Sequence, residues 1–292
     1  MAIGWVGAGK MGAPMIRNLL AQGQHVTVTE PGSAQRDGIV AAGAVVAHTL
    51  SDHAASHIVF ATLPNDAVLT DVVFGKGDQP GLRDTMARGA CFIEMSTVSP
   101  ECSAQVAQAL EEKGIAYLRA PVSGSTTLAE QATLTILTSG DRAAWEAALP
   151  FLEMMSVRQF YLGHREEARY MKLVLNTLVG ASSAILSEAL ALGASGGLSH
   201  AKMMEVVNES AVASPLLKYK SEAIVSGDYA PAFTVDQMIK DFSLISDAAR
   251  RNNIPLFTTG LILEAYRAAS NSGLSDKDFF ALVKWQSDMS PQ

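Results

Sequence analysis

The stretch "VGAGKMG", Val6 to Gly12, decides the fold of the N-terminal part of this chain. It lies between a short apolar run and the amphipathic segment "KMGAPMIRNLLAQG", so it predicts a strand, a tight turn and a helix. Gly7, Gly9 and Gly12 form the pattern G-x-G-x-x-G, which in this context is typical of a dinucleotide-binding loop. Gly7 permits the turn, Gly9 lets the backbone approach a pyrophosphate, and Gly12 allows close packing of helix on strand. The N–H groups and positive potential of the helix start would hold the anion.

An acidic residue ends the next strand-like run. Glu30 follows "HVTVT", 18 residues past Gly12, where a carboxylate can accept hydrogen bonds from an adenosine ribose. A carboxylate would also repel a 2′-phosphate, and Pro31 and Gly32 offer no arginine to receive one, although Arg36 is not far away. The sequence therefore favours NAD over NADP. A glycine turn that binds nothing is the alternative, and the acid after the second strand argues against it.

Beyond this loop, the first half of the chain alternates β-branched runs with amphipathic stretches, which is typical of a parallel sheet with helices on both faces. The later strands are expected at "HIVFATL", "CFIEMS", "IAYLRA", "TLTILTSG" and "VRQFYLG". After Gly163 the strand pattern ceases, and a long helix is predicted from about Glu166 to the Gly196-Gly197 pair. We therefore expect an α/β Rossmann-type domain at 1–163 and an all-helical domain at 164–292, joined by a long interdomain helix.

Three further helix starts are marked by capping residues. Ser99 precedes Pro100 in "SPECSAQVAQALEEKG", and Ser199 precedes the next helical run after the glycine pair. Thr234 and Gln237 have the spacing of a capping box ahead of "MIKDFSLISDAARRNN".

Composition limits the classes of partner. The chain has 292 residues and a formal net charge of −7, which argues against nucleic acid or an anionic membrane as the main partner. The N-terminus lacks the pattern of a signal peptide, and no uninterrupted apolar run reaches membrane-spanning length. Cys91 and Cys102 lack metal-site spacing and fit a reducing compartment. His53 and His57 lie four apart, but no further ligand follows at zinc-site spacing. We expect a surface helix there, no metal, and a cytoplasmic protein.

Small and polar residues end several predicted strands, at the edge where an open α/β sheet binds its ligand. "ATLPNDAV" places Leu63, Pro64 and Asn65 at this edge, and "EMSTVSP" places Thr97 there. "APVSGS" adds Ser123 to Ser125, a short loop whose N–H and hydroxyl groups could bind a carboxylate. Alone, that loop would more often be an ordinary turn.

Lys172 and Asn176 lie in the apolar run "YMKLVLNTLVG". Being four apart, they project from one face of a helix. A lysine there could simply reach water with its ammonium group. Alternatively, an amine whose pKa is lowered by desolvation from about 10.4 towards neutrality could exchange a proton with a hydroxyl group or a carbonyl oxygen.

These motifs together resemble the β-hydroxyacid dehydrogenase family, which includes 3-hydroxyisobutyrate dehydrogenase, tartronate semialdehyde reductase and, more distantly, 6-phosphogluconate dehydrogenase. The glycine loop, "LPND", "EMSTVSP", "APVSGS", "KLVLN" and "KDF" stand in the family's order and spacing. The similarity runs from Ile3 to about Leu282. It implies a nicotinamide cofactor and a small 3-hydroxy acid that is interconverted with its semialdehyde or 3-oxo acid. It also implies a homodimer or homotetramer.

The resemblance assigns roles position by position. Lys172 matches the family's catalytic lysine, and Asn176 its substrate-contacting asparagine. Ser123 and Gly124 match the loop that binds the substrate carboxylate, and Lys240 matches a lysine near the nicotinamide. In that arrangement Lys172 would face a cleft between two domains. The residues expected to contact the dinucleotide are Gly7, Ala8, Gly9, Lys10, Met11, Gly12, Glu30, Leu63, Pro64, Asn65, Thr97 and Lys240.

The sequence departs from the family pattern near the expected substrate site. Glu166 and Ala168 replace two of three glycines before the lysine, Arg119 stands where aspartate is common, and Ser125 replaces a second loop glycine. These changes predict either an unusual substrate or, as a plainer interpretation, solvated or paired surface charges at Arg119, Glu166 and Glu167.

Two other functions are weighed against the dehydrogenase. Imine reductases resemble this fold and its glycine loop, but they generally lack the lysine-asparagine and lysine-aspartate pairs represented by Lys172, Asn176, Lys240 and Asp241. A non-catalytic nucleotide-binding scaffold is the third possibility. Retention of every expected acid-base position argues against it.

Overall fold

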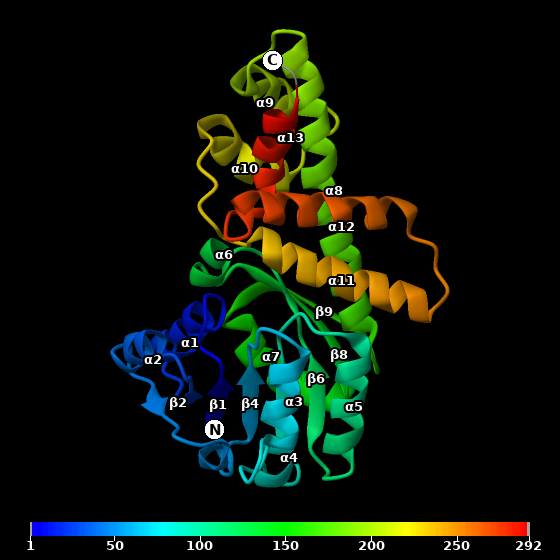
Figure 1. Ribbon diagram of the computed structural model, residues 1–292. Coiled ribbons are helices and arrows are strands. Elements are labelled where there is room, and N and C mark those ends of the chain that lie inside the picture. Colours follow the sequence, from blue (N-terminus) through cyan, green and yellow to red (C-terminus); the bar gives the residue numbers. More distant parts are fainter. Residues whose placement is uncertain (1, 291–292) are drawn as a thin grey trace. The chain divides into compact units, whose positions relative to one another are not determined.

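The computed structural model describes residues 2–290, which form two compact units, Met1–Lys172 and Leu173–Gln292 (Figure 1). The division falls inside one long helix, α8 (Glu167–Ser195). The first unit is an α/β domain and the second is all-helical, as the sequence predicts.

The first unit is built on one twisted sheet in the order β3-β2-β1-β4-β5-β6-β8-β7, with β9 paired to β8. Strands β3 to β6 of this order run parallel, β8 is antiparallel to β6 and β7, and β9 is parallel to β8. The order from β3 to β6 is that of a dinucleotide-binding fold, with the turn after β1 at its switch point. The strands are β1 (Ile3–Val6), β2 (Val26–Thr29), β3 (Val45–Val46), β4 (Ile58–Ala61), β5 (Cys91–Glu94), β6 (Ala116–Arg119), β7 (Val122–Ser123), β8 (Leu134–Gly140) and β9 (Ser156–Gly163).

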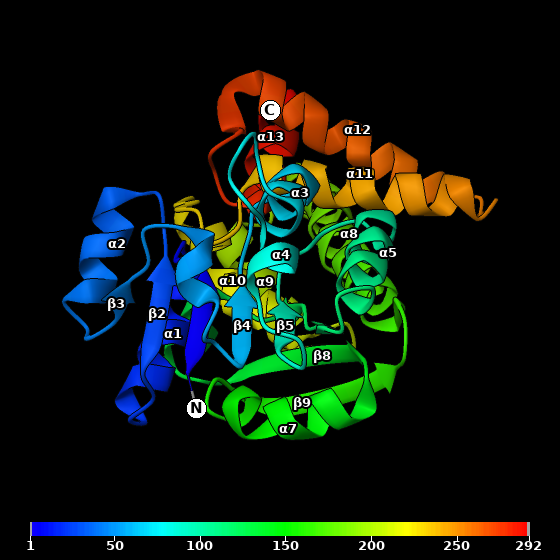
Figure 2. The ribbon, with the colours of Figure 1, turned by 90° about the horizontal axis from the view of Figure 1, so that it is seen from below.

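Helices cover both faces of this sheet (Figures 1 and 2). Successive strand residues point to opposite faces, so Ile58 and Phe60 belong to one core cluster and Val59 and Ala61 to another. Helices α1 and α7 contribute to the first cluster, and α3 and α5 to the second. The helices are α1 (Gly12–Ala21), α2 (Ser33–Val40), η1 (Leu50–His53), α3 (Asp66–Phe74), α4 (Leu82–Thr85), α5 (Pro100–Glu111), α6 (Thr126–Glu130) and α7 (Arg142–Glu153).

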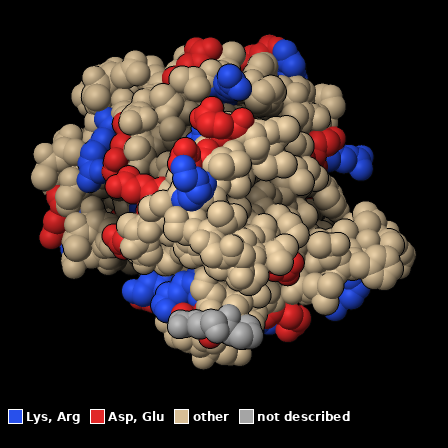
Figure 3. All heavy atoms as spheres, turned by 90° about the horizontal axis from the view of Figure 1, so that it is seen from above, with Lys and Arg blue, Asp and Glu red and all other residues tan. Residues whose placement is uncertain are grey.

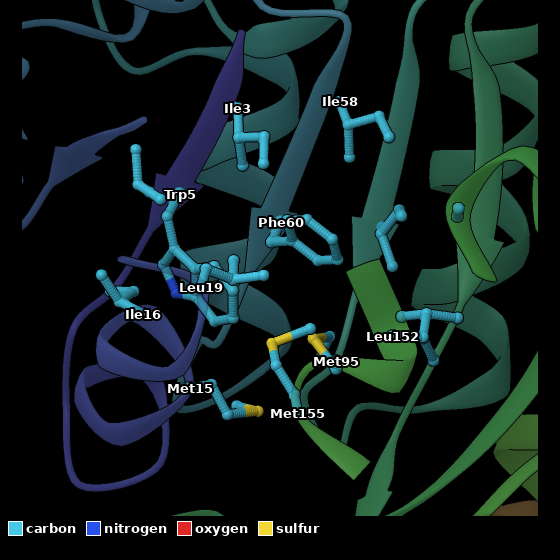
Figure 4. Close-up of a cluster of buried hydrophobic side chains, with 14 of the residues drawn as sticks. Ile3, Trp5, Met15, Ile16, Leu19, Ile58, Phe60, Met95, Leu152 and Met155 are labelled. Carbon is cyan, nitrogen blue, oxygen red and sulfur yellow. The ribbon is translucent and has the colours of Figure 1, made fainter. Parts of the chain in front are cut away.

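Figure 4 shows the first of these clusters, where side chains of β1, β4, α1 and α7 meet. The rings of Trp5 and Phe60 stack with their centroids 5.0 Å apart. Met15, Met95 and Met155 come from three different elements or loops and fill the remaining space. Strands that are buried on both faces require apolar residues at nearly every position, which explains the continuous apolar runs of β1 and β4.

The second unit packs helices around a core to which η3 and every helix from α8 to α13 contribute. The predicted capping box is present, since Thr234 N–H donates to Gln237 Oε1 at 2.8 Å and Gln237 N–H donates to Thr234 Oγ at 3.1 Å. The caps at Ser99 and Ser199 are confirmed as well. The elements after α8 are α9 (His200–Glu209), α10 (Pro215–Ser226), α11 (Val235–Arg251), α12 (Phe257–Ala269), η2 (Ser270–Leu274), η3 (Phe279–Ala281) and α13 (Leu282–Met289).

Helix α8 has the length and composition that could cross a membrane, but core helices of soluble proteins satisfy the same criterion. Close to half of its most apolar window, 44 %, is buried within the protein. On the face drawn in Figure 3, charged side chains of both signs lie near one another and wide areas carry neither sign.

The expected surface helix carrying His53 and His57 is not formed. Element η1 is a single 3₁₀ turn that ends at His53, and His57 lies in the loop before β4. His53 is fully buried because Gly4, without a side chain, lets the imidazole lie against β1; an added Cβ would come within 2.5 Å of Nδ1. His53 Nε2 lies 2.8 Å from Thr29 Oγ1, whereas Nδ1 has no hydrogen-bond partner among residues 2–290. Within the same residues, no group of three or more His, Cys, Asp or Glu could hold a metal.

Burial of His53 makes stability depend on pH. Burial lowers the pKa of His53 to about 4, below the 6.5 that is ordinary for histidine. Between these values the unfolded chain takes up a proton that the folded chain does not, so the His53 contribution is present above pH 6.5 and is lost as the pH falls towards 4. We expect a loss of about 3 kcal/mol in the free energy of unfolding over that range. Urea denaturation at several pH values should show it, and His53→Gln should have a smaller slope. Equal slopes would contradict the assignment.

Candidate active site

Two of the three glycines in the loop between β1 and α1 leave no room for a side chain, and the third borders open space. Gly7 has φ +88°, and an added Cβ would lie 2.3 Å from Thr62 O. A Cβ on Gly12 would lie 2.3 Å from Gly7 O, so the start of α1 packs directly on the turn. By contrast, a Cβ on Gly9 would meet no atom within 4 Å. The first and third glycines are thus required by packing, while Gly9 borders open space that an anion could enter.

Two side chains, one from β1 and one from the residue after β4, hold the loop by hydrogen bonds. Trp5 Nε1 donates to Gly7 O at 2.9 Å, and Thr62 Oγ1 donates to the same oxygen at 2.5 Å. Helix α1 begins after Met11, whose side chain makes no capping hydrogen bond, and its first turn contains no acidic residue. Lys10 lies exposed beside it. The N–H groups at this helix start are therefore not capped by a side chain, which suits an anionic ligand.

Glu30 lies against the glycine loop, as the ribose-binding hypothesis requires. Its Oε2 accepts from Ala8 N–H at 2.6 Å, and its Oε1 accepts from Gly32 N–H at 2.7 Å. Each carboxylate oxygen retains a second lone pair that could accept from a ribose hydroxyl. Arg36, the basic residue weighed for a 2′-phosphate, is in helix α2 with its Nε 3.6 Å from an oxygen of Asp37.

The loops after β4 and β5 adjoin each other at the same edge of the sheet. Leu63 N–H donates to Ser96 Oγ at 2.6 Å, and Leu63 is buried. Thr97 follows in the second loop and is half-buried, whereas Pro64 is exposed. The predicted cofactor residues of these two loops thus lie close together, because parallel strands end at one edge.

Asn65 has a structural task that strand-end reasoning did not show. It is the N-cap of α3, and its Oδ1 accepts from Val68 N–H at 3.0 Å. The next residue, Asp66, accepts from Ser99 N–H at 2.9 Å and from the Ser99 hydroxyl at 2.5 Å. Since Ser99 caps α5, this pair joins the starts of two helices and fixes both loops.

The serine loop follows β7. Gly124 has φ +145°, and an added Cβ would lie 2.6 Å from the Leu134 side chain, so glycine is required there. Ser125, which replaces a second glycine of the family pattern, is the N-cap of α6 and accepts from Leu128 N–H at 3.4 Å. Its hydroxyl therefore caps the helix, and Ser123, Gly124 and Ser125 stay predicted contacts of a substrate carboxylate.

Lys172 and Asn176 stand one turn apart on α8, as expected, Lys172 half-buried and Asn176 buried. The Asn176 amide Nδ2 donates to Asp241 Oδ2, and the other Asp241 oxygen lies 3.0 Å from Lys240 Nζ. Asp241 is fully buried, and Lys240 is one-third exposed. Asp241 therefore links two predicted site residues and fixes the orientation of the Asn176 amide. Its signal in the sequence is an aspartate on the apolar face of α11, where a buried carboxylate requires partners.

Gly180, one turn after Asn176, lets α11 approach α8. An added Cβ would lie 2.3 Å from the Phe242 ring and 3.0 Å from Met238 Sδ. Gly180→Ala should lower the free energy of unfolding by about 1–3 kcal/mol through overpacking, despite a gain in helix propensity of about 1 kcal/mol. Gly260 in α12 is the matched control, because its Cβ would meet nothing within 4 Å and alanine should be neutral or stabilising. Denaturant unfolding of both variants tests this, and equal stabilities would contradict the close approach.

The departures at Arg119 and Glu166 are partners of each other. Arg119 Nε donates to Glu166 Oε1 at 2.9 Å, and Arg119 Nη2 contacts the same oxygen. Their side chains are only 7 % and 15 % exposed. The two charges are therefore paired, as one interpretation of the sequence expects, but they are not surface charges. Ala168 is buried, and its N–H donates to Ser139 Oγ at 3.1 Å. Glu167, in contrast, is exposed.

A second ion pair at this place was missed in the sequence. Arg169 is fully buried and donates to Glu94, to Ser96 O at 2.8 Å, to Tyr117 OH at 3.0 Å and to Ser103 Oγ at 3.1 Å. Burial alone would lower the pKa of Arg169, but Glu94, Tyr117 and Glu166 together outweigh it, and the pKa lies above its ordinary value. Burial also raises the pKa of Tyr117 to about 12, so this side chain stays a neutral phenol. The only sign of this ion pair in the sequence is Glu94, a glutamate within the apolar run "CFIEMS".

Comparison with known proteins agrees with these features. The NAD-binding domain of 6-phosphogluconate dehydrogenase matches residues 2–163. The domain described as NAD-binding of NADP-dependent 3-hydroxyisobutyrate dehydrogenase matches residues 167–286. Together these two family models account for nearly the whole chain.

Individual relatives extend over the same length. A 2-(hydroxymethyl)glutarate dehydrogenase of Eubacterium barkeri is 35 % identical, over 97 % of this chain and 94 % of its own. An NAD-dependent L-serine dehydrogenase of Pseudomonas aeruginosa is 32 % identical, over 97 % and 96 %. The crystal structure of a 3-hydroxyisobutyrate dehydrogenase from Salmonella typhimurium superposes with a TM-score of 0.87 at 27 % identity, covering 98 % of this chain and 99 % of its own. The chain therefore belongs to the 3-hydroxyisobutyrate dehydrogenase family of NAD(P)-binding hydroxy acid dehydrogenases.

Proposed function

We propose that this protein is an NAD-preferring dehydrogenase that interconverts a small 3-hydroxy acid and its semialdehyde or 3-oxo acid, with Lys172 as general acid and base. The observation that carries the proposal is the Asn176–Asp241–Lys240 arrangement one helical turn beyond Lys172. A buried aspartate that orients an amide beside a lysine is well suited to fix a reacting oxygen. The substrates in the relatives' names support the same class, because each carries a hydroxyl group on a carbon that is β to a carboxylate.

The chemistry divides between cofactor and protein. A nicotinamide dinucleotide held by the glycine loop and Glu30 would supply the hydride acceptor for oxidation and the hydride donor for reduction. The Lys172 amine takes the hydroxyl proton during oxidation and gives it back to the carbonyl oxygen during reduction. Asn176, oriented by Asp241, holds that oxygen by a hydrogen bond. Ser123 and Gly124 bind the substrate carboxylate, and Lys240 adds positive charge near the nicotinamide.

The cofactor would be held by the residues around the glycine loop. Gly9 leaves open space for the pyrophosphate, and the start of α1 supplies N–H groups. Glu30 accepts from the ribose and disfavours a 2′-phosphate, so NAD is preferred over NADP. The L-serine dehydrogenase relative is NAD-dependent by its name, which agrees with this preference.

Two alternatives make different predictions. An imine reductase would reduce imines and would not depend on Lys172, and a scaffold would bind NADH without turnover. The ion pair of Lys240 with Asp241, and the hydrogen bond that Asn176 Nδ2 donates to Asp241 Oδ2, favour the hydroxy acid reaction over both.

We also propose that the protein is a cytoplasmic homodimer or homotetramer. Four large apolar side chains of α8 are at least half exposed and recur at spacings of four or seven, which places them along one face. They are Val174, Leu178, Ile185 and Leu192. Both cysteines are free thiols, which fits a reducing compartment. Sedimentation velocity would test the assembly, and a monomer at micromolar concentration would contradict it.

The test is the formation of NADH and NADPH by the purified protein with a panel of 3-hydroxy acids at mildly alkaline pH. The panel comprises 3-hydroxyisobutyrate, L-serine, 3-hydroxypropionate, glycerate and 2-(hydroxymethyl)glutarate. We expect turnover of at least one member, faster with NAD than with NADP. Faster turnover with NADP would overturn the Glu30 argument alone. Tight NADH binding without turnover of any member would favour imines, and then the scaffold.

A further inference from the structure

We propose that four charged side chains, Glu94, Arg119, Glu166 and Arg169, form a clamp that positions Lys172. They form the two ion pairs described above, Glu94 with Arg169 and Arg119 with Glu166. All four belong to the first unit, as does Lys172. The inference rests on the proposed function, since it assigns these residues a role in placing its acid-base group.

The sheet supplies one side of the clamp. Glu94 ends β5 and Arg119 ends β6, and the two residues are direct neighbours in the parallel register. Neighbouring residues in register project from the same face of a sheet. Two opposite charges thus stand side by side at the carboxyl edge, where the loops of the cofactor site also begin.

The beginning of α8 supplies the other side. Glu166 O accepts from Tyr170 N–H at 3.0 Å, so Glu166 stands at the helix start, and Arg169 follows three residues later on the same face. Each charged helix residue meets a strand residue of opposite charge. If the partners were exchanged, Glu166 would meet Glu94 and Arg169 would meet Arg119, which would bring like charges together. The two pairs therefore fix both the position and the rotation of the first turn.

Tyr117 connects the two pairs. The Arg119 guanidinium carbon lies 4.6 Å from the centre of its ring, and its hydroxyl accepts from Arg169 Nη2 at 3.0 Å. Ser139 adds a third attachment, because its Oγ accepts from Ala168 N–H and donates to Arg165 O at 2.6 Å. The helix start is thus held to three strands, β5, β6 and β8.

The position of Lys172 follows from this attachment. Lys172 lies three residues beyond Arg169, less than one turn further along the same continuous helix. Because helix residues keep a fixed rotation and rise, holding the first turn sets the direction in which the lysine projects. Buried ion pairs can often be replaced by apolar residues without loss of stability, so fixing geometry is a better reason for two such pairs than stability is.

The test uses Arg119, whose pair with Glu166 is less buried than that of Arg169. In Arg119→Met we expect kcat to fall about 100-fold, as for a catalytic group displaced by about 1 Å, with the KM for NAD unchanged. The reversed pair Arg119→Glu with Glu166→Arg should recover part of the loss. Arg142→Met is the matched control, because the Arg142–Glu146 pair of α7 is more than half exposed, and its kcat should not change.

A double-mutant cycle separates positioning from general damage. If the clamp acts through Lys172, Arg119→Met should have no further effect on kcat in a Lys172→Ala background. Equal effects in both backgrounds, or an unchanged kcat in folded Arg119→Met, would overturn the inference. Circular dichroism establishes folding, and Glu166→Gln, which removes the other charge of the same pair, replaces Arg119→Met in the cycle if that variant does not fold.

Hydrogen exchange provides a readout that does not need turnover. Amides of residues 168–172 should exchange at least tenfold faster in Arg119→Met than in the unsubstituted protein, while those of α11 stay unchanged. Should the unsubstituted protein oxidise no hydroxy acid, faster exchange would still support the clamp, and the proposed function alone would fail. Unchanged exchange would reject the clamp.

Discussion

Lys172→Ala should lower kcat for hydroxy acid oxidation by at least about 10²- to 10⁴-fold, the usual contribution of a positioned acid-base group. NADH binding should be retained, because the glycine loop and Glu30, which would hold the cofactor, lie far from Lys172 along the chain. Lys172→Arg should lose turnover as well, since an arginine stays protonated and cannot take the hydroxyl proton. Absorbance at the NADH band gives kcat, and fluorescence titration gives NADH affinity.

The matched control is Lys218→Ala, which removes an exposed lysine of α10. Its kcat should equal that of the unsubstituted protein. A Lys172→Ala variant with undiminished turnover would remove Lys172 from the mechanism and would favour an imine reductase, which does not use this lysine.

Arg169→Met should be the most destabilising single substitution considered for the first unit. It leaves the fully buried Glu94 carboxylate without its cation, and breaking a buried pair in this way costs about 3–5 kcal/mol. The three hydrogen bonds from Arg169 to Ser96, Tyr117 and Ser103 are lost with it. Urea denaturation measures the effect as a lower midpoint with the same slope.

The double variant Glu94→Leu with Arg169→Met distinguishes the cost of an unpaired charge from the loss of packing. Removing both charges should recover most of the stability, because apolar residues of similar volume often replace a buried pair at little cost. A single variant within about 1 kcal/mol of the unsubstituted protein would show that Glu94 finds another partner or takes up a proton.

Much of the fold could be predicted because its signals are local. All seven predicted strands are present, and five of them, β1, β4, β5, β6 and β8, are short runs whose two faces are buried in the sheet. The glycine loop and the caps at Ser99, Ser199 and Thr234 follow from backbone requirements that a few residues express. The strands β3 and β7 were missed, because two residues carry no periodic pattern.

The parts of the site that were missed depend on partners distant in the sequence. Glu94 and Arg169 meet across 75 positions, and Asn176 and Asp241 across 65, so neither contact leaves a local pattern. His53 was expected at the surface, and it is buried because Gly4 makes room for it. Asn65 and Ser125, two predicted ligand contacts, also cap helices, a role that strand-end reasoning did not show.

The departures from the family pattern show the same limit. Arg119 and Glu166 each look like an isolated change of charge in the sequence, and only the fold shows that they compensate each other. A charged residue in place of aspartate and another in place of glycine are therefore one structural change. This change affects how α8 is attached to the sheet at least as much as it affects the choice of substrate.

The most direct test of the central claim is the transfer of label from substrate to cofactor. A 3-hydroxy acid that the protein oxidises would be prepared with deuterium in place of every hydrogen on its carbinol carbon and incubated with NAD, and the NADH formed would be analysed by mass spectrometry. Direct hydride transfer predicts one deuterium in every molecule of NADH. NADH without deuterium, or no reduced cofactor from any acid of the panel, would contradict it.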